Sequence, residues 1–163
     1  MINEIIYYQT PIGCFEIIGS PAGISTINIL NTSVPNSTDL SPMMQACVDQ
    51  LEAYFKGELT DFDLKLSFEQ GTDFQKSVWL ELLKIPYGKT ISYSDVAQRL
   101  GKSRGASQAI GKAVGSNPIG VIVPCHRVVG KDGSLTGFAS GLDNKRFLLK
   151  LEKAAVVSQG TLF

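Results

Sequence analysis

The residues best suited to chemistry lie together in the segment Pro124-Cys125-His126-Arg127-Val128. It contains the only histidine of the chain and one of its three cysteines. A thiol becomes a strong nucleophile as its thiolate, and a nearby base or cation lowers its pKa. A buried structural cysteine is the competing interpretation, and on a strand two neighbouring side chains would point to opposite faces. The pair therefore indicates chemistry only if other segments supply partners.

Glu152 is the candidate third member of this group. A helix is predicted over Leu142–Lys153, and Glu152 lies in its last turn, where the helix dipole disfavours an anion. A specific partner would explain that position, and His126 is the neutral candidate. A carboxylate that orients an imidazole, which draws a proton from a thiol, is a nucleophile–base–orienter arrangement. We expect a water molecule between His126 and Cys125, and both hydrolysis and alkyl acceptance are open at this point.

Length and composition indicate a globular protein of one or two small domains. The chain has 163 residues, of which 44% are hydrophobic and 18% charged. It has neither an apolar run near the ~20 residues that span a membrane nor the basic-then-apolar start of a secretory signal. Its cysteines are too few and too widely spaced for a disulfide framework, and a single histidine argues against zinc. We expect an intracellular, cytoplasmic protein without a metal.

Charge is divided unevenly along the chain although its net charge is zero. Residues 1–70 carry two basic and nine acidic side chains, and residues 71–163 carry thirteen basic and six acidic ones. This division suggests two domains, the second of which faces a polyanion. An inert dipolar surface is the alternative.

The first seventy residues predict a small sheet and one helix that serve as a scaffold. Three segments rich in Ile, Tyr and Phe are separated by turns with Pro and Gly, which indicates an antiparallel meander. Ser41, Pro42 and the apolar spacing that follows predict a helix that Gly57 ends. The strands are expected at Glu4–Gln9, Cys14–Gly19 and Ile24–Leu30, and the helix at Pro42–Phe55.

The remaining residues predict helices around a strand that leads to Cys125. Thr72 and Gln75 have the spacing of a capping box that opens a helix. Helices over 92–100 and 106–114, joined by a glycine-containing turn, predict a helix-turn-helix. The apolar run Ile119–Val123 predicts a buried strand.

The second helix of this pair has unusually small side chains. Gly111 within a helix costs about 1 kcal/mol relative to Ala, which suggests that something approaches the helix closely. Small residues with Lys112 would suit a narrow nucleic-acid groove. A tight contact with another helix is the equal alternative.

Together these segments resemble the methylated-DNA–protein-cysteine methyltransferases, also called O6-alkylguanine-DNA alkyltransferases. The resemblance covers residues 71–153 with high specificity and extends more weakly over residues 4–70. It rests on Pro124–Val128, Ser116-Asn117-Pro118, Ile91-Ser92-Tyr93, Thr136-Gly137-Phe138 and Gly141-Leu142.

The resemblance implies an α+β fold of two domains. Residues 1–70 would form a ribonuclease H-like scaffold, with a three-stranded antiparallel sheet and a helix. Residues 71–163 would form a mostly helical domain that binds DNA and accepts the alkyl group, with a winged-helix-like helix-turn-helix.

The resemblance also implies a reaction. The damaged guanine is flipped out of duplex DNA, and Cys125 attacks its O6-alkyl carbon, with O4-alkylthymine as a second expected substrate. His126 and Glu152 correspond to the proton relay, Asn117 ties the cysteine segment to the helix-turn-helix, and Tyr93 helps to expel the nucleotide. The thioether product is inert, so that each molecule reacts once without a cofactor.

Further residues follow from the same resemblance. The substrate pocket is expected to include Val123, Phe138, Ala139, Ser140 and Lys145. The expected DNA-binding residues are Tyr93, Ser94, Ser103, Ala106, Gln108, Gly111, Lys112, Gly115, Arg127 and Lys131. The chain departs from the family where Gln108 replaces the usual arginine, Ser140 a frequent glycine and Gly120 a proline.

Three functions are compared on this basis. Direct repair by a monomer acting on double-stranded DNA with O6-alkylguanine, near the nucleoid, is favoured by Cys125 and the basic half. A protein that binds lesions without transfer is the alternative, and the presence of Cys125 argues against it. A Cys-His-Glu hydrolase is the third, but no segment suggests an acyl-substrate groove.

Overall fold

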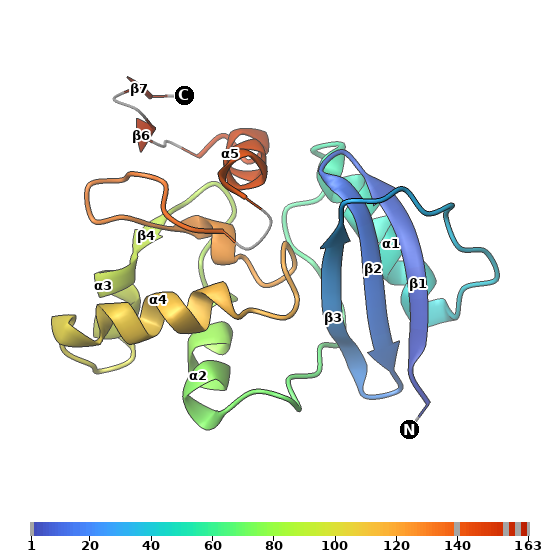
Figure 1. The fold of residues 1–163 in the computed structure, drawn as a ribbon, viewed down its shortest axis with the longest axis horizontal. Coiled ribbons are helices and arrows are strands. Elements are labelled where there is room, and N and C mark those ends of the chain that lie inside the picture. The colour runs from blue at the N-terminus through green and yellow to red at the C-terminus, as the bar shows by residue number, and fades with distance from the viewer. Residues whose placement is uncertain (1, 139–140, 155–156, 159–160, 163) are drawn as a thin grey trace. The chain divides into compact units, whose positions relative to one another are not determined.

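The computed structural model describes residues 2–138, 141–154, 157–158 and 161–162. The chain divides into two units (Figure 1), Met1–Glu69 with Pro118–Gly120, and Gln70–Asn117 with Val121–Phe163. The first holds an antiparallel sheet and a helix, and the second is mostly helical. The predicted α+β class is therefore confirmed. Within the described ranges, no helix is both long and apolar enough to cross a membrane.

The sheet of the first unit has the order β1-β2-β3. Its strands are β1 (Glu4–Thr10), β2 (Gly13–Ser20) and β3 (Gly23–Leu30), all antiparallel. The register pairs Tyr7 with Glu16 and Glu16 with Asn28. Because side chains alternate along a strand, Phe15 and Ile17 point to the opposite face and are fully buried.

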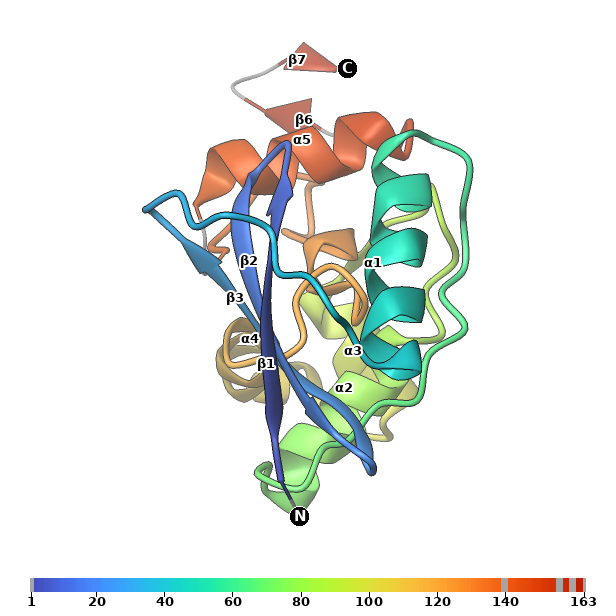
Figure 2. The same ribbon diagram turned by 90° about the vertical axis from the view of Figure 1, so that its right-hand side faces the viewer.

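Helix α1 (Pro42–Phe55) covers that buried face (Figure 2). Ser41 caps the helix by accepting a hydrogen bond from the Met44 backbone, and Pro42 occupies its first turn. The apolar stripe of α1 is buried, and Phe55 meets Phe15 edge to face with centroids 6.0 Å apart. Cys47 lies in this core, and burial raises its pKa to about 12, which makes it an inert thiol.

Two later segments pair with β3. Lys65 and Leu66 run beside its start, where Ile24 N donates to Lys65 O at 2.8 Å. Gly23 has φ +130°, and a Cβ there would lie 2.7 Å from Lys65 O, so that only glycine suits this position. Further along, Ile27 N donates to Pro118 O at 2.8 Å.

Helix α2 (Asp73–Leu82) opens the second unit with the predicted capping box. Thr72 Oγ accepts from Gln75 N at 3.1 Å, and the Gln75 side chain accepts from Thr72 N at 2.9 Å. Trp79 is buried, and its indole Nε1 donates to Ala113 O at 2.9 Å. Trp79 therefore anchors α2 to the helix-turn-helix.

The helix-turn-helix consists of α3 (Tyr93–Arg99) and α4 (Ser107–Gly115), with a 3₁₀ turn at Arg104–Ala106. Ser92 caps α3 in a capping box with Asp95. Just before α3, β4 (Ile91–Ser92) pairs in parallel with β5 (Val128–Val129). This pairing brings the start of α3 to the end of the cysteine segment.

The C-terminal elements are α5 (Leu142–Leu151), β6 (Val157–Ser158) and β7 (Thr161–Leu162). Helix α5 buries Lys145, Leu148 and Leu149. Glu152 is the C-cap residue of α5, directly after its last turn.

The expected strand over Ile119–Val123 is wrong. The run contains isolated bridge residues, such as Ile119 opposite Ile27, but no continuous strand. Val121 has φ +73°, a left-handed conformation that a β-branched residue rarely adopts. The chain therefore turns within this apolar run, although all its residues except Gly120 are buried.

Candidate active site around Cys125

Cys125 begins a short 3₁₀ turn, Cys125–Arg127, in the second unit. The residue is 8% exposed. Burial raises the pKa of its thiol, whereas hydrogen bonds from Asn117 and the backbone, and the charge of Lys145, lower it. Because the net effect is a raised pKa, the resting residue is a thiol that needs a base before it attacks.

Asn117 holds the segment that carries this thiol. Its Nδ2 donates to Val123 O at 2.9 Å, and its side chain also hydrogen-bonds Cys125. Asn117 comes two residues after the end of α4. Side-chain hydrogen bonds therefore join the end of the helix-turn-helix to the cysteine segment.

His126 and Glu152 form a buried pair. His126 Nε2 lies 2.7 Å from Glu152 Oε2, and both side chains are inaccessible to solvent. Burial lowers the pKa of His126 despite the opposing effect of Glu152, so the imidazole is neutral at rest. Burial alone would raise the pKa of Glu152, but hydrogen bonds from His126 and Arg127 hold it well below its usual range. A neutral imidazole beside an ionised carboxylate can accept a proton.

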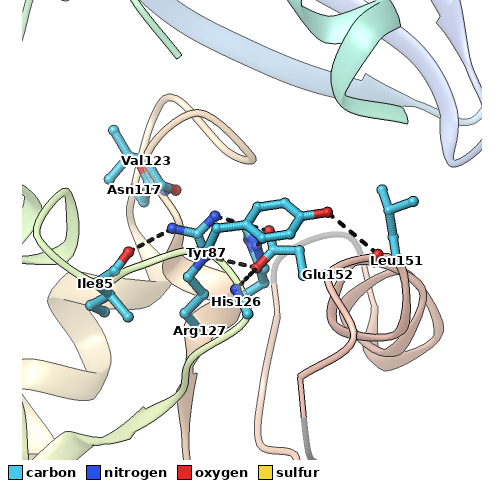
Figure 3. A network of polar contacts seen from close by, with 9 residues as sticks. Ile85, Tyr87, Asn117, Val123, His126, Arg127, Leu151 and Glu152 are labelled. Atoms are coloured by element: carbon cyan, nitrogen blue, oxygen red, sulfur yellow. Dashed lines mark hydrogen bonds and ion pairs between the residues drawn. The ribbon is translucent and has the colours of Figure 1, made fainter. Parts of the chain in front are cut away.

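The sequence predicted that Arg127 contacts DNA, but the structure places its side chain inside the protein. The residue is 6% exposed, and its guanidinium points inward. Nε donates to Glu152 Oε1 at 2.8 Å, Nη2 to Glu152 Oε2 at 3.0 Å and Nη1 to Ile85 O at 2.6 Å. Figure 3 shows the guanidinium between these two partners. A guanidinium whose N–H groups already donate to partners inside the protein is not placed to bind a DNA phosphate.

The loop after α2 completes the surroundings of Glu152. The Tyr87 ring lies 5.7 Å from Arg127 Cζ, a cation–π distance, and Tyr87 OH donates to Leu151 O at 3.4 Å (Figure 3). Gly88 N donates to Glu152 Oε1 at 3.4 Å. Sequence reasoning missed these residues, and the Pro-Tyr-Gly turn before Lys89 was their only signal.

Of the expected pocket residues, the structure describes Val123, Phe138 and Lys145. Val123 is buried, and Lys145 donates from Nζ to Val128 O at 2.7 Å and Thr136 O at 2.8 Å. Burial lowers the pKa of Lys145 to about 8, although Cys125 acts in the opposite direction. Phe138 is partly buried. Ala139 and Ser140 lie outside the described residues.

Tyr93 connects α3 to the same segment. Its hydroxyl lies 2.7 Å from Thr136 Oγ1, and burial raises its pKa, so that it remains a hydrogen-bond donor. Gly111 of α4 lies against its ring, since a Cβ there would be 3.7 Å from the ring atoms. This is ordinary contact, so packing against Tyr93 does not require glycine at this position.

The other expected DNA-binding residues are polar or small and reach the surface of the helix-turn-helix unit. Tyr93, Ser94, Ser107 and Lys131 line an open cavity of about 290 Å³. Ser103, Gln108, Lys112, Gly115 and Lys131 are exposed, and Ser94, Ala106 and Gly111 are partly exposed. Their surface carries the cations Lys112 and Lys131.

The buried pair makes stability depend on pH. The pKa of His126 is lowered from 6.5 in the folded chain, so that on acidification the unfolded chain binds this proton first. Stability therefore falls as the pH drops below 6.5, and the lowered pKa of Glu152 adds a further loss below 4.5. We expect a slope of up to about 1.4 kcal/mol per pH unit from His126, measured by denaturant unfolding.

The matched variant is His126→Gln, which removes the titrating group. Its stability should be nearly flat between about pH 7 and 5, where no other group is expected to titrate. An equal acid dependence in both proteins would contradict a buried neutral His126.

Two family descriptions match the chain. The first, "6-O-methylguanine DNA methyltransferase, DNA binding domain", covers residues 73–154. The second, "6-O-methylguanine DNA methyltransferase, ribonuclease-like domain", covers residues 5–68. A curated Mycobacterium bovis protein named methylated-DNA–protein-cysteine methyltransferase is 46% identical over 166 residues, which is 98% of this chain and 99% of that protein.

Solved structures of the same kind are similar throughout. The crystal structure of Mycobacterium tuberculosis O6-methylguanine methyltransferase matches with a TM-score of 0.82 and 43% identity, over 93% of both chains. A Mycobacterium tuberculosis OGT in complex with DNA matches with a TM-score of 0.80 and 45% identity, over 90% of this chain and 91% of that one.

Proposed function

The chain belongs to the 6-O-methylguanine DNA methyltransferase family, and on this premise we propose that it repairs DNA by moving an alkyl group from guanine O6 to Cys125. It is a methylated-DNA–protein-cysteine methyltransferase, and DNA is its partner. A lesion-binding protein without transfer is not favoured, because the chain retains Cys125 beside a base.

One observation supports the proposal most strongly. The only histidine of the chain is buried beside the cysteine in sequence and held by an ionised carboxylate. Burial raises the pKa of both Cys47 and Cys125, but only Cys125 is followed directly by the histidine. Cys125 is therefore the cysteine best suited to lose its proton to a base.

The reaction is a single displacement. The thiol proton passes to His126 through a bridging water molecule. The sulfur forms a bond to the alkyl carbon as the bond from that carbon to O6 breaks, and the electron pair remains on guanine. His126 then releases the proton that it took from the thiol, guanine takes up one proton, and Tyr93 supplies a hydrogen bond to the ring. The product is a thioether, so that each molecule acts once.

DNA meets the second unit at its helix-turn-helix. Helix α4 enters the minor groove with Gln108 and Lys112, while Ser94 and Lys131 lie at the cavity beside Tyr93. The damaged nucleotide is flipped toward Cys125. Val123, Phe138 and Lys145, with Ala139 and Ser140 in the same segment, form the base pocket.

The finer features of this function are also proposals. The substrate is duplex DNA with O6-alkylguanine, and O4-alkylthymine is a second substrate. The protein acts as a monomer inside the cell, near the nucleoid. Residues 1–70 form the scaffold domain, and residues 71–163 form the domain that binds DNA and accepts the alkyl group.

Transfer is tested with duplex DNA whose O6-methylguanine carries a labelled methyl group. We expect the label to become acid-stable on the protein at one methyl per chain, and an undamaged duplex labelled elsewhere to transfer nothing. Continued release of label to solvent would instead indicate a hydrolase.

Gln108→Arg should strengthen DNA binding. Gln108 is exposed on α4, and an arginine there could reach a base edge or phosphate, worth about 1 kcal/mol or roughly fivefold in Kd. The measurement is a titration of labelled duplex at fixed salt concentration.

Gln45→Arg in α1 is the matched control, since it adds the same charge at an exposed position of the first unit. If both variants tighten binding equally, the gain comes from net charge alone and Gln108 does not lie at the groove.

A further inference from the structure

The carboxylate of Glu152 is surrounded by donors on both oxygens. Oε1 accepts from Arg127 Nε at 2.8 Å and Gly88 N at 3.4 Å, while Oε2 accepts from Arg127 Nη2 at 3.0 Å and lies 2.7 Å from His126 Nε2. Arginine has donors only and keeps its charge at every pH of interest. Its planar fork therefore occupies both oxygens with the geometry of a bidentate ion pair.

This arrangement decides where the proton of His126 lies. A carboxylate whose two oxygens both accept from a guanidinium is ionised, and an ionised carboxylate can only accept hydrogen bonds. His126 Nε2 must then carry the hydrogen of its 2.7 Å contact. A neutral imidazole has one N–H and one lone pair, so Nδ1 holds the lone pair. Among the residues that the structure describes, Nδ1 is buried without a hydrogen-bond partner.

We propose that Arg127 is a positioning residue, which keeps Glu152 ionised and thereby fixes the His126 tautomer whose Nδ1 accepts the proton of Cys125. This inference rests on the proposed function, because it assigns a role within the same relay. Arg127 touches neither the substrate nor the thiol in this role. It acts through Glu152 and then through His126, so its removal should change protonation before it changes geometry.

Without Arg127 the buried carboxyl group would hold its proton more strongly. Glu152 is 2% exposed, and burial favours the neutral form of a carboxyl group. A protonated Glu152 could donate to Nε2, which would place the imidazole hydrogen on Nδ1 and remove the acceptor that the thiol needs. The relay would then work only at higher pH, where Glu152 ionises.

Other titratable groups also face His126 and Glu152. Tyr87 from the loop after α2 interacts with Glu152, Lys145 of α5 lowers the pKa of His126, and Cys125 precedes His126 in the same turn. The side chains of Tyr87 and Lys145 are still present when Arg127 is replaced, although the Tyr87 ring loses its contact with the guanidinium. A shift seen on replacing Arg127 therefore comes from the guanidinium.

The tautomer can be measured directly, because His126 is the only histidine of the chain. Labelling histidine with ¹⁵N gives two ring signals whose positions separate an N–H from a lone-pair nitrogen. For the unaltered protein without DNA at neutral pH, we expect Nε2 to carry the hydrogen and Nδ1 to be unprotonated. A hydrogen on Nδ1 would overturn the proposal, whatever any variant does.

The variant Arg127→Met removes the guanidinium while keeping an apolar stem. We expect the ring hydrogen to move toward Nδ1, the transfer rate to fall at least tenfold at neutral pH, and part of this loss to recover as the pH rises. Arg127→Lys keeps a charge but no fork, and should lie between the two proteins. If Arg127→Met does not fold, Arg127→Lys and the unaltered protein carry the test.

Arg146→Met is the matched control, since Arg146 pairs with Asp143 on the surface of α5. It should leave the tautomer and the pH dependence of transfer unchanged. If a folded Arg127 variant keeps the hydrogen on Nε2 and the same pH profile, Arg127 is only structural and the proposal is wrong. The ring signals do not depend on DNA, so they separate this failure from a protein that transfers no alkyl group.

Discussion

Replacing Cys125 with Ala is expected to abolish alkyl transfer and to leave lesion binding intact. The thiol supplies the electron pair that forms the new bond, and no neighbouring side chain can replace it, so that we expect a loss greater than about 10⁴-fold. The residues of α3 and α4 that we propose to face DNA are untouched by this change. Transfer is measured with methyl-labelled DNA, and binding with an O6-methylguanine duplex.

Cys47→Ala is the matched control for this variant. It deletes the same thiol group from another buried cysteine, one whose pKa burial raises to about 12. We expect normal transfer after correction for any loss of stability. Transfer by Cys125→Ala, or its loss in Cys47→Ala, would assign the alkyl acceptor to a different residue.

Replacing Glu152 with Gln has the second largest effect, on both rate and stability. The change leaves the Arg127 guanidinium buried without its counter-ion, which typically costs about 3–5 kcal/mol in the free energy of unfolding. It also removes the anion that stabilises a protonated His126, and we expect transfer to slow by about 10²–10⁴-fold. Denaturant unfolding and single-turnover transfer measure the two effects separately.

Glu81→Gln is the matched control, because Glu81 is also largely buried but pairs with the exposed Lys84. Such a pair contributes at most about 1 kcal/mol, and Glu81 has no place in the relay. If both substitutions lower the transfer rate and the stability equally, Glu152 acts only through its negative charge and not through its contacts with His126 and Arg127.

Most of the secondary structure could be predicted because its signals are local. The Thr72 and Gln75 capping box, the Ser41 cap and the strand meander depend on residues a few positions apart. The helix-turn-helix could be predicted for the same reason. Its second helix was expected over residues 106–114 and lies one residue later, at Ser107–Gly115, because the 3₁₀ turn at Arg104–Ala106 comes first.

The segment before Cys125 could not be predicted from local pattern. A short apolar run is compatible with a buried strand, but Val121 adopts φ +73° and the run turns. Hydrogen bonds outside the local pattern accompany this conformation. Pro118, before the run, accepts from Ile27 N of β3, and Asn117 donates to Val123 O at the end of the run. Cys125 and His126 lie in the 3₁₀ turn that follows and not in a strand, so the alternation of side chains along a strand does not apply to them.

The relay was only partly predictable from sequence. Glu152 could be connected with His126 because an anion at the end of α5 needs a partner, and the 2.7 Å contact agrees with that argument. The second partner, Arg127, could not be identified, because an arginine in a basic half of the chain suggests DNA. Only the structure shows that the Arg127 guanidinium donates its hydrogen bonds to Glu152 and Ile85 inside the protein.

The most direct test of the central claim is the mass of the protein and its peptides after exposure to a duplex with one O6-methylguanine. We predict that the intact protein gains one methyl group, that the gain lies on the peptide containing Cys125, and that it never exceeds one per chain. The recovered DNA should contain unmodified guanine at the former lesion. An unchanged protein mass with folded, DNA-bound protein, or a methyl group on Cys14 or Cys47 instead, would contradict the account.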